Sequence, residues 1–584
     1  MSTVDISKLR TAAAHLLALA VTSLYKDAKL GTFGITDHGF YYDIEFDEPI
    51  SSDELPAIQA KMLEIVLENV KFSQENRSYD SVVKEFTSKE QPYKRELLDE
   101  VGSRKVEITM IGGNDGFIDL AAGPVVESTS QLEHLWLLDV SGAYWKGDDK
   151  RSMLTRISGA CFASEKELEA FREYRAELLR RDHRVMGKKL GFYSVDPEVG
   201  TGLIFWSPRG RFVRDALAGI IKQRVLRLGA ELVETPVLAN AEKTILITQP
   251  QSEQVIAKST HEDTERWYAV RQQVVGAHVR MFSWKERSYR DLPWKVGEIA
   301  KVVRYEKSGE LEGLHRSREI TQDTTTIVCT LEQLEKELEL LITTIVAFVR
   351  DLGFTDFELV YRLPVATTKQ QKQILAEIET NVKSISKKLA ISITFEAAEH
   401  RVIAEPELVM RVTDSLKQKR EWSKIQLLMS LPIEQQIEYM GSDGEVHNPV
   451  VIRATIAGSL ERVIATMIEH YAGVLPLWLT YEHARVIPVT SKQELYAEKV
   501  ARQLLERGIR ATIDSDAEPL EGKIKQAEEE KVPYMLIVGE KEQTTNGISV
   551  RVQGHGDIGL LDIETFIRDI QGEISSKSIK SALI

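Results

Sequence analysis

Residues 304–323, RYEKSGELEGLHRSREITQD, are rich in side chains that bind phosphate or carboxylate groups. The runs VVRYE and REITQD predict two antiparallel strands joined by a charged loop that contains glycine. On such strands Arg304 and Glu306 would share one face, and Arg316 and Arg318 would share a face on the returning strand. A guanidinium is planar and always charged, so several that converge on one sheet would suit a nucleoside triphosphate. A surface hairpin held by ion pairs is the alternative interpretation.

Two helices are expected to flank this stretch. One spans about 209–228, ends near Gly229 and is followed by a strand that runs into Pro236. The other lies within GSLERVIATMIEHYAG (458–473) and carries Arg462 at its start. An arginine near a helix N-terminus suits an anion, although a surface ion pair would explain Arg462 equally.

The pattern R-x-E, a loop and then R-x-R-x-x-TQD resembles motif 2 of the class II aminoacyl-tRNA synthetases. The flanking segments RSYRDLP (287–293) and VVRYEKSG (302–309) are similar to those of threonine–tRNA ligases, and the resemblance extends from about residue 8 to 580. It implies a class II antiparallel-sheet catalytic core, an N-terminal editing-like α+β domain and a C-terminal α/β anticodon-binding domain. It also implies a homodimer that forms through the helix and strand of motif 1.

The resemblance divides the chain into four regions. These are an editing-like domain (1–163), a connector helix (164–190), a class II catalytic-type core (191–482) and an anticodon-binding-like domain (483–584). Because the match begins almost at residue 1, we do not expect the ubiquitin-like domain that precedes the editing domain in many relatives.

By resemblance, Arg304 holds the α-phosphate of ATP and the amino-acid carboxylate, and Glu306 reads the adenine amino group. Arg316 and Arg462 contact the γ-phosphate, and Gln426 lies near ATP. Adenylate formation is an in-line attack by a carboxylate on phosphorus, so positioning and charge stabilisation are the work of such residues. ATP and Mg²⁺ are the implied cofactors.

Threonine–tRNA ligases hold Zn²⁺ with one Cys and two His, and the metal takes the amino and hydroxyl groups of the substrate. The aligned positions in this chain are Val275, Thr326 and Arg453. Valine cannot bind zinc, threonine is a poor ligand and arginine would repel the ion. His278 is kept, but a single histidine makes no zinc site. We therefore expect no zinc.

The rest of the amino-acid pocket keeps Gln322 but departs elsewhere. Thr324 stands where the family has an aspartate beside the substrate hydroxyl, and IAEPE (403–407) replaces a segment with Tyr and Lys. Ile320 replaces the aromatic residue that stacks on adenine. A site that reads a hydroxyl group rejects an isostere that lacks it far better than an apolar pocket does. We therefore expect low fidelity, threonine recognition by new contacts, or another substrate.

A helix expected over residues 8–25 carries His15. In the family, an H-x-x-x-H pair on this helix meets a Cys and a His, and together they hydrolyse wrongly charged seryl-tRNA. In this chain Thr11, Ala121 and Val125 occupy three of those positions, and only His15 remains. Methyl groups cannot transfer protons, so we expect the editing fold without its chemistry.

Composition limits the remaining classes of function. With 584 residues, 43% hydrophobic and 28% charged, the chain should form three or four globular domains. A formal net charge of −14 gives no overall basic signature, so tRNA binding would need local basic patches. The best patch, which could equally be a solvated connector, comprises Arg175, Arg180, Arg181, Arg184, Lys188 and Lys189.

Three sequence patterns that would indicate a metal site, a membrane span or secretion are missing. Cys161 and Cys329 belong to no metal motif and are expected to be buried thiols in a reducing compartment. No segment has the apolar length of a membrane span, and residues 1–8 carry no signal-peptide pattern. We expect a cytoplasmic protein without membrane partners.

The leading interpretation is ATP-dependent aminoacylation resembling that of threonine–tRNA ligases, zinc-free and editing-deficient. One alternative is a non-catalytic paralogue that binds ATP, tRNA or a protein. Another is activation of a different small amino acid, for tRNA or another carrier.

Overall fold

The computed structural model describes residues 5–113, 116–148, 150–240, 256–258, 267–364, 369–397 and 405–584. The chain forms two compact units, Met1–Glu177 and Leu178–Ile584. The boundary falls within helix α5 (Glu165–Arg181). None of the described helices combines the length and apolarity needed to cross a membrane.

The first unit contains two antiparallel sheets, ordered β1-β2-β7-β6 and β3-β4-β5. Its alanine-rich helix α1 is capped by Asp5, and it packs with α2 against the four-stranded sheet. The helices are α1 (Ile6–Leu24), α2 (Leu55–Leu67), α3 (Tyr79–Ser88) and α4 (Pro92–Val101). The strands are β1 (Lys29–Ile35), β2 (Gly39–Glu45), β3 (Phe72–Ser78), β4 (Lys105–Ile111), β5 (Phe117–Leu120), β6 (Leu135–Tyr144) and β7 (Met153–Cys161).

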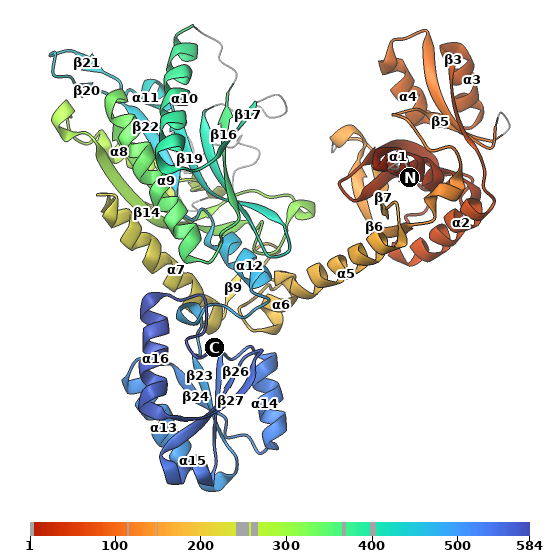
Figure 1. Cartoon of the computed structure of the whole chain (residues 1–584). Coiled ribbons are helices and arrows are strands. Elements are labelled where there is room, and N and C mark those ends of the chain that lie inside the picture. The colour runs from red at the N-terminus through yellow and green to blue at the C-terminus, as the bar shows by residue number, and fades with distance from the viewer. Residues whose placement is uncertain are drawn as a thin grey trace. The chain divides into compact units, whose positions relative to one another are not determined.

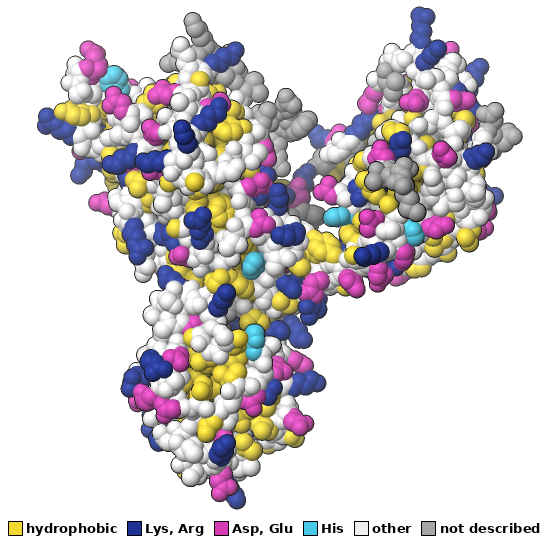
Figure 2. Space-filling model, in the orientation of Figure 1, with side chains coloured by type: hydrophobic (Ala, Val, Ile, Leu, Met, Phe, Trp, Pro, Cys, Tyr) yellow, Lys and Arg dark blue, Asp and Glu magenta, His cyan; other side chains and the backbone are white. Residues whose placement is uncertain are grey.

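The connector that was expected as one helix over 164–190 is two helices, α5 and α6 (His183–Lys189). The break falls at Asp182, whose carboxylate accepts the backbone N–H of Arg184 at 2.7 Å and so begins a new helix. The carboxylate of Asp182 also binds the Arg184 guanidinium, which is therefore paired rather than free for RNA. On the face that Figure 2 shows, basic and acidic side chains are interspersed over the chain.

The second unit is built on a sheet of eight described strands, ordered β10-β14-β15-β22-β19-β18-β16-β17. Every neighbouring pair is antiparallel except the edge pairs β10–β14 and β16–β17. The strands are β10 (Glu231–Leu232), β14 (Trp294–Val303), β15 (Glu319–Cys329), β16 (Phe357–Leu363), β17 (Ile393–Ala397), β18 (Glu407–Thr413), β19 (Lys419–Leu428) and β22 (Val450–Thr455).

Helices cover the apolar face of this sheet (Figure 1). The main ones are α7 (Pro208–Arg227), α9 (Leu334–Asp351), α10 (Lys369–Leu389) and α12 (Leu460–His470). The predicted helices at 209–228 and within 458–473 are thus confirmed, and α7 ends before Gly229, whose φ is +77°. The shorter elements are β8 (Tyr193–Ser194), β9 (Phe205–Trp206), β11 (Leu238–Asn240), β12 (Ile256–Lys258), β13 (Trp267–Val270), α8 (Val275–Phe282), α11 (Leu431–Glu434), β20 (Tyr439–Met440) and β21 (Val446–His447).

The C-terminal part of the second unit is a mixed sheet, ordered β24-β23-β25-β26-β27 (Figure 1). Helices α13 and α16 pack on one face and α14 packs on the other. The strands are β23 (Ala484–Pro488), β24 (Ala511–Ile513), β25 (Tyr534–Val538), β26 (Gly547–Val552) and β27 (Gly556–Asp562). The helices are α13 (Glu494–Glu506), α14 (Leu520–Glu529), α15 (Glu540–Thr545) and α16 (Ile563–Ser576).

Candidate functional site

One face of the eight-stranded sheet is polar, and its register brings together residues that are far apart in the chain. Directly opposed residues of antiparallel strands point to the same face, and successive residues alternate between faces. Thr326 of β15 lies opposite Arg453 of β22, which lies opposite Gln426 of β19. Their neighbours Ile327 and Ala454 point the other way, into the apolar core. Arg453 and Gln426 thus lie side by side on the polar face.

A cavity of about 300 Å³ opens on this face. Arg304, Arg453 and Arg462 line it together with Gln322 and Gln426. Arg304 follows the last residue of β14, and Arg462 lies in the first turn of α12. Three guanidinium groups around one cavity, beside the positive end of a helix, are suited to an anionic ligand.

Arg304 and Arg453 each donate to a neutral amide. The Nη2 of Arg304 lies 2.8 Å from the Oε1 of Gln322, and the Nη1 of Arg453 lies 2.9 Å from the Oε1 of Gln426. Burial and, to a smaller extent, the charge of Arg304 lower the pKa of Arg453 to about 10. Burial likewise lowers the pKa of Arg304.

Arg462 is held by two backbone carbonyls. Its Nε donates to the oxygen of His315 at 3.3 Å and its Nη1 donates to the oxygen of Glu421 at 3.0 Å. Burial lowers its pKa as well. Among the described residues, none forms an ion pair with any of the three cavity arginines.

Asp323 fixes the turn from which α12 begins. Its buried carboxylate accepts the backbone N–H groups of Ile456, Ala457 and Gly458 at 2.5, 3.0 and 2.8 Å. Gly458 has a φ of +77°, and a Cβ there would lie 2.5 Å from the backbone oxygen of Trp422. Burial raises the pKa of Asp323 to about 6, against those three hydrogen bonds. Asp323 was not among the predicted site residues. The sequence does contain a signal for its role, because Asp323 is the one charged residue in the run ITQDTTTIV.

The predicted hairpin is wrong at its tip. Because β14 ends at Val303 and β15 begins at Glu319, the charged residues between them lie in a loop and share no strand face. In this loop Arg316 donates to Glu306 at 2.7 Å and to Glu310 at 2.8 Å, and the backbone N–H of Arg304 donates to the carbonyl of Arg318 at 2.9 Å, so side-chain contacts add to isolated backbone bonds where a strand ladder was expected. The Arg316 side chain is 46% exposed, and neither it nor Glu306 lines the cavity.

The positions aligned with zinc ligands hold other contacts. Val275 is buried in an apolar cluster with Val328. The hydroxyl of Thr326 lies 2.8 Å from the Nδ1 of His278, whose Nε2 lies 3.3 Å from Glu298. Because a carboxylate only accepts, Nε2 carries the proton and Nδ1 accepts from Thr326. Both nitrogen atoms of His278 are therefore engaged within the protein.

The other predicted pocket residues divide between the cavity and the interior. Ile320 and Gln322 line the cavity, whereas Thr324 is 2% exposed and does not line it. The first two residues of 403–407 lie outside the described residues. Glu407 begins β18, and its carboxylate binds Lys424 at 2.9 Å.

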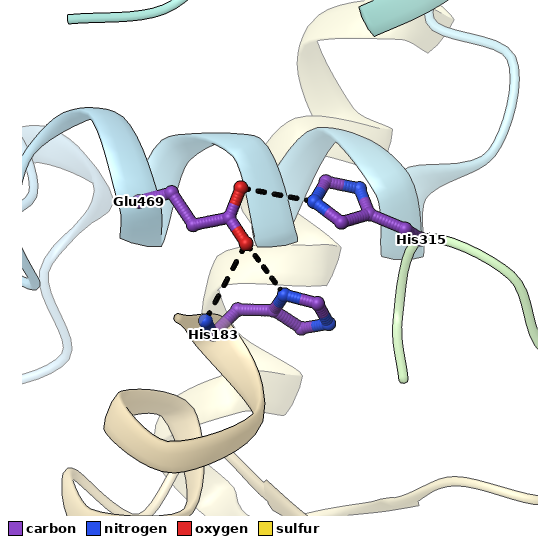
Figure 3. A group of neighbouring side chains, drawn as sticks. All are labelled: His183, His315 and Glu469. Atoms are coloured by element: carbon purple, nitrogen blue, oxygen red, sulfur yellow. Dashed lines mark hydrogen bonds and ion pairs between the residues drawn. The ribbon is translucent and has the colours of Figure 1, made fainter. Parts of the chain in front are cut away.

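A second polar cluster lies behind the cavity (Figure 3). The carboxylate of Glu469 on α12 lies 2.7 Å from the Nδ1 of His183 and 3.0 Å from the Nε2 of His315. Within the described ranges, this is the only group of three or more His, Cys, Asp or Glu side chains whose ligand atoms lie close enough together to hold one metal ion. The Nε2 of His183 accepts the backbone N–H of Leu314 at 3.0 Å, which places the proton of that ring on Nδ1. The three groups therefore form a hydrogen-bonded network, in which the Nδ1 of His315 has no partner among the described residues.

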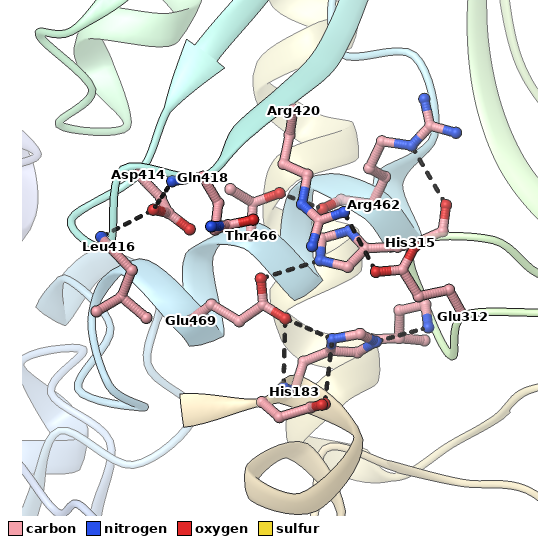
Figure 4. Close-up of polar contacts among 12 residues, drawn as sticks. His183, Glu312, His315, Asp414, Leu416, Gln418, Arg420, Arg462, Thr466 and Glu469 are labelled. Atoms are coloured by element: carbon pink, nitrogen blue, oxygen red, sulfur yellow. Dashed lines mark hydrogen bonds and ion pairs between the residues drawn. The ribbon is translucent and has the colours of Figure 1, made fainter. Parts of the chain in front are cut away.

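This network joins the motif 2 loop to α6 and α12 (Figure 4). Burial raises the pKa of Glu469, but hydrogen bonds from His183 and His315 outweigh it and hold that pKa below its ordinary value. Burial lowers the pKa of His315 despite the contact with Glu469. Because the carbonyl of His315 binds Arg462, the network positions one of the cavity arginines. None of the three residues was expected at the site.

His15 of the first unit lies in a buried charged cluster. Its Nδ1 lies 3.1 Å from Asp119, which also binds Lys94 at 2.5 Å and the hydroxyl of Tyr42 at 2.6 Å. Burial lowers the pKa of Lys94 and raises that of Tyr42. Thr11 donates instead to a backbone oxygen of its own helix, at 3.0 Å. Lys94, Tyr42 and Asp119 were not predicted, since the three lie on separate elements.

Known proteins match both the sequence and the fold. Residues 258–471 match the family model described as "tRNA synthetase class II core domain (G, H, P, S and T)", and residues 483–573 match "Anticodon binding domain". The chain is 35% identical to a threonine–tRNA ligase of Thermus thermophilus over 97% of this chain and 88% of that protein. It is 34% identical to one of Dehalococcoides mccartyi, over 98% and 97% of the two chains.

Two solved structures have the same fold over part of the chain. One is an RNA-binding domain of threonyl-tRNA synthetase from Cryptosporidium parvum, with a TM-score of 0.60 and 27% identity, covering 69% of this chain and all of that one. The other is a threonyl-tRNA synthetase described as putative from Aeropyrum pernix, with a TM-score of 0.57 and 20% identity, covering 69% and 97%.

Proposed function

This chain belongs to the threonine–tRNA ligase family of class II aminoacyl-tRNA synthetases, and we propose that it is an ATP-dependent aminoacyl-tRNA ligase that works without zinc and without editing. The observation that best supports this activity is that Arg304 and Arg462 line the same cavity and that neither has an acidic partner among the described residues. The family resemblance assigns both of them to ATP.

In the proposed reaction, the carboxylate of an amino acid attacks the α-phosphorus of ATP and pyrophosphate leaves. Arg304 stabilises the charge that develops on the α-phosphate, and Arg462 stabilises the γ-phosphate. A terminal ribose hydroxyl of tRNA then attacks the adenylate carbonyl, and AMP leaves. Gln322 and Gln426 fix the guanidinium groups of Arg304 and Arg453, so these cations are in place before the substrates bind.

Mg²⁺ fits a site of this composition. Hard cations bind carboxylate and phosphate oxygens, and Glu421 lines the cavity; because its carboxylate already binds Arg362 and Arg411, the phosphate oxygens of ATP would supply most of the ligands. When bound, Mg²⁺ neutralises charge on the β- and γ-phosphates. Glu306 and Arg316 would join the nucleotide site only if their mutual ion pair opens, and we retain their assignment to adenine and the γ-phosphate as part of the proposal.

Zinc does not fit the aligned residues. Val275 packs in an apolar cluster, Thr326 is hydrogen-bonded to His278, and Arg453 places a cation on the polar face. The absence of editing is supported by Thr11, Ala121 and Val125, which supply no proton-transfer group of the kind that the relatives carry there.

The proposed partner is tRNA, which binds residues 483–584 as an anticodon-binding domain. The other proposed regions are the editing-like domain (1–163), the connector (164–190) and the catalytic core (191–482). The proposed location of the enzyme is the cytoplasm. A homodimer is supported by exposed apolar side chains on and after α7. Leu226, Leu232, Val237 and Leu238 are 43–55% exposed, as expected of a surface that a second copy covers. Light scattering at several concentrations tests this assembly.

ATP–pyrophosphate exchange across the twenty amino acids, followed by tRNA charging, tests the function. Arg304→Ala and Arg462→Ala should each lower exchange by about 100-fold or more, as the loss of one charge-stabilising donor does in other enzymes. Arg280→Ala is the matched control, because Arg280 is exposed on α8 and does not line the cavity. If ATP binds and no amino acid supports exchange, the chain is a non-catalytic paralogue.

A further inference from the structure

Arg453 lines the same cavity and is held in place by Gln426, but no group of the substrates has been assigned to it above. Its Nη1 donates to Gln426 at 2.9 Å, and its buried Nε has no hydrogen-bond partner among the residues that the structure describes. Two carboxylates act on it electrostatically, Glu407 and Asp323. Both are already engaged, the first by Lys424 and the second by three backbone N–H groups.

The same sheet pairs its other arginines with acids. Arg362 of β16 binds three carboxylates at 2.5 to 3.2 Å. Arg411 of β18 also contacts three carboxylates, at 3.1 to 3.3 Å. A cation that is partly withdrawn from water and has no acidic partner is costly, so a polar sheet leaves one in place where a ligand supplies the counter-charge. Arg453 is such a cation, whereas Arg362 and Arg411 are structural.

The anions of the activation reaction account for the other two arginines. ATP and the α-carboxylate of the amino acid are assigned to Arg304 and Arg462. None of these groups is assigned to Arg453, and an anionic group on the substrate side chain would supply the counter-charge that Arg453 lacks. The α-ammonium of the substrate cannot do so, because a guanidinium only donates and repels a cation.

We propose that the amino acid activated at this site carries an anionic group on its side chain, a carboxylate or a phosphate monoester, which Arg453 binds; this inference rests on the proposed ligase function. A planar guanidinium with a free Nε binds either group through paired hydrogen bonds. A neutral side chain would leave Arg453 unpaired, and a site of this kind rejects the ligand that cannot pair with it.

Pyrophosphate exchange with matched acid and amide substrates tests the inference on the unmodified enzyme. The pairs are aspartate with asparagine and glutamate with glutamine, and O-phosphoserine and O-phosphothreonine are each compared with their free amino acids. We expect one acid to exceed its neutral partner by at least about tenfold in kcat/KM, and threonine by a similar factor. The carboxylate and phosphate arms identify which anion is bound.

Variants then assign the preference to Arg453. Arg453→Gln should remove the preference for the acid, and Arg453→Lys should keep part of it. Thermal melting and ATP binding check the fold of each variant; if neither folds, the substrate pairs on the unmodified enzyme decide alone. Exchange with threonine or another neutral amino acid and no preference for acids would overturn the inference and leave the ligase function intact. Exchange with no amino acid would instead reject the function itself. A preference for acids that survives in Arg453→Gln would remove Arg453 from substrate recognition.

Discussion

Substitution of Glu469 should separate charge from hydrogen bonding in the network behind the cavity. In Glu469→Ala, the rings of His183 and His315 both lose their acceptor. His183 cannot move its proton, because its Nε2 accepts the N–H of Leu314. Breaking a buried charged contact and leaving donors unpaired costs about 3–5 kcal/mol of the free energy of unfolding.

Glu469→Gln should cost far less. Its amide oxygen would accept from His183, and its NH₂ group would donate to His315 once that ring holds its proton on Nδ1. This shift is open to His315 because no described residue contacts its Nδ1 through a hydrogen bond. Only the charge assistance of two hydrogen bonds is then lost, about 1–2 kcal/mol.

Urea denaturation followed by tryptophan fluorescence measures both variants. The midpoint should fall in the order wild type, Gln, Ala. Glu434→Gln and Glu434→Ala are matched controls on an exposed glutamate, with expected changes within about 0.5 kcal/mol. Equal losses for Gln and Ala would refute the proton shift on His315, and an unchanged midpoint for Ala would refute the network.

Three further outcomes follow from named contacts. The pKa of Glu469 is held below its ordinary 4.5, so its stabilising contribution is present above about pH 4.5 and is lost as the pH falls through the folded-state pKa. The difference in the free energy of unfolding between wild type and Glu469→Gln, measured from pH 7 to 3, should therefore become smaller on acidification. A difference that grows on acidification would contradict this sign. Asp323→Ala removes the acceptor of three backbone N–H groups and should lower the free energy of unfolding by about 3 kcal/mol or more, whereas unchanged urea midpoints would mean that the turn holds itself. Purified enzyme should contain no stoichiometric zinc by elemental analysis and keep its exchange activity after dialysis against a zinc-selective chelator; one zinc per chain would contradict the assignment of Val275, Thr326 and Arg453.

Much of the fold could be predicted because its signals are local. Amphipathic spacing and stop residues gave α7 to within one residue at each end, and the βα alternation after Ala484 gave the mixed C-terminal sheet. The break at Asp182 was missed, although an Asp before a new helical turn is an N-cap signal. Residue type and spacing singled out Arg304 and Arg462, the family resemblance assigned both to ATP and added Gln426, and the structure brings these three to one cavity.

Contacts between distant segments could not be predicted in this way. His183 and Glu469 are 286 positions apart, and His315 and Glu469 are 154 apart, so no local pattern joins them. The tip of the motif 2 hairpin was missed for a related reason. Arg316 finds its partners, Glu306 and Glu310, across a loop, and those ion pairs replace the strand pairing that the alternation suggested.

The arginines of the central sheet show why register matters for function. Arg362, Arg411 and Arg453 each lie within a strand, and no local sequence pattern shows which of them has acidic partners. Strand pairing places the first two among acids and the third against Gln426 and Thr326. An unpaired cation destabilises the unliganded protein, and natural proteins keep such unfavourable features mainly at functional sites. A ligand that binds Arg453 should therefore stabilise the enzyme more than ATP alone does, because it supplies a counter-charge to Arg453, whereas ATP is assigned to Arg304 and Arg462.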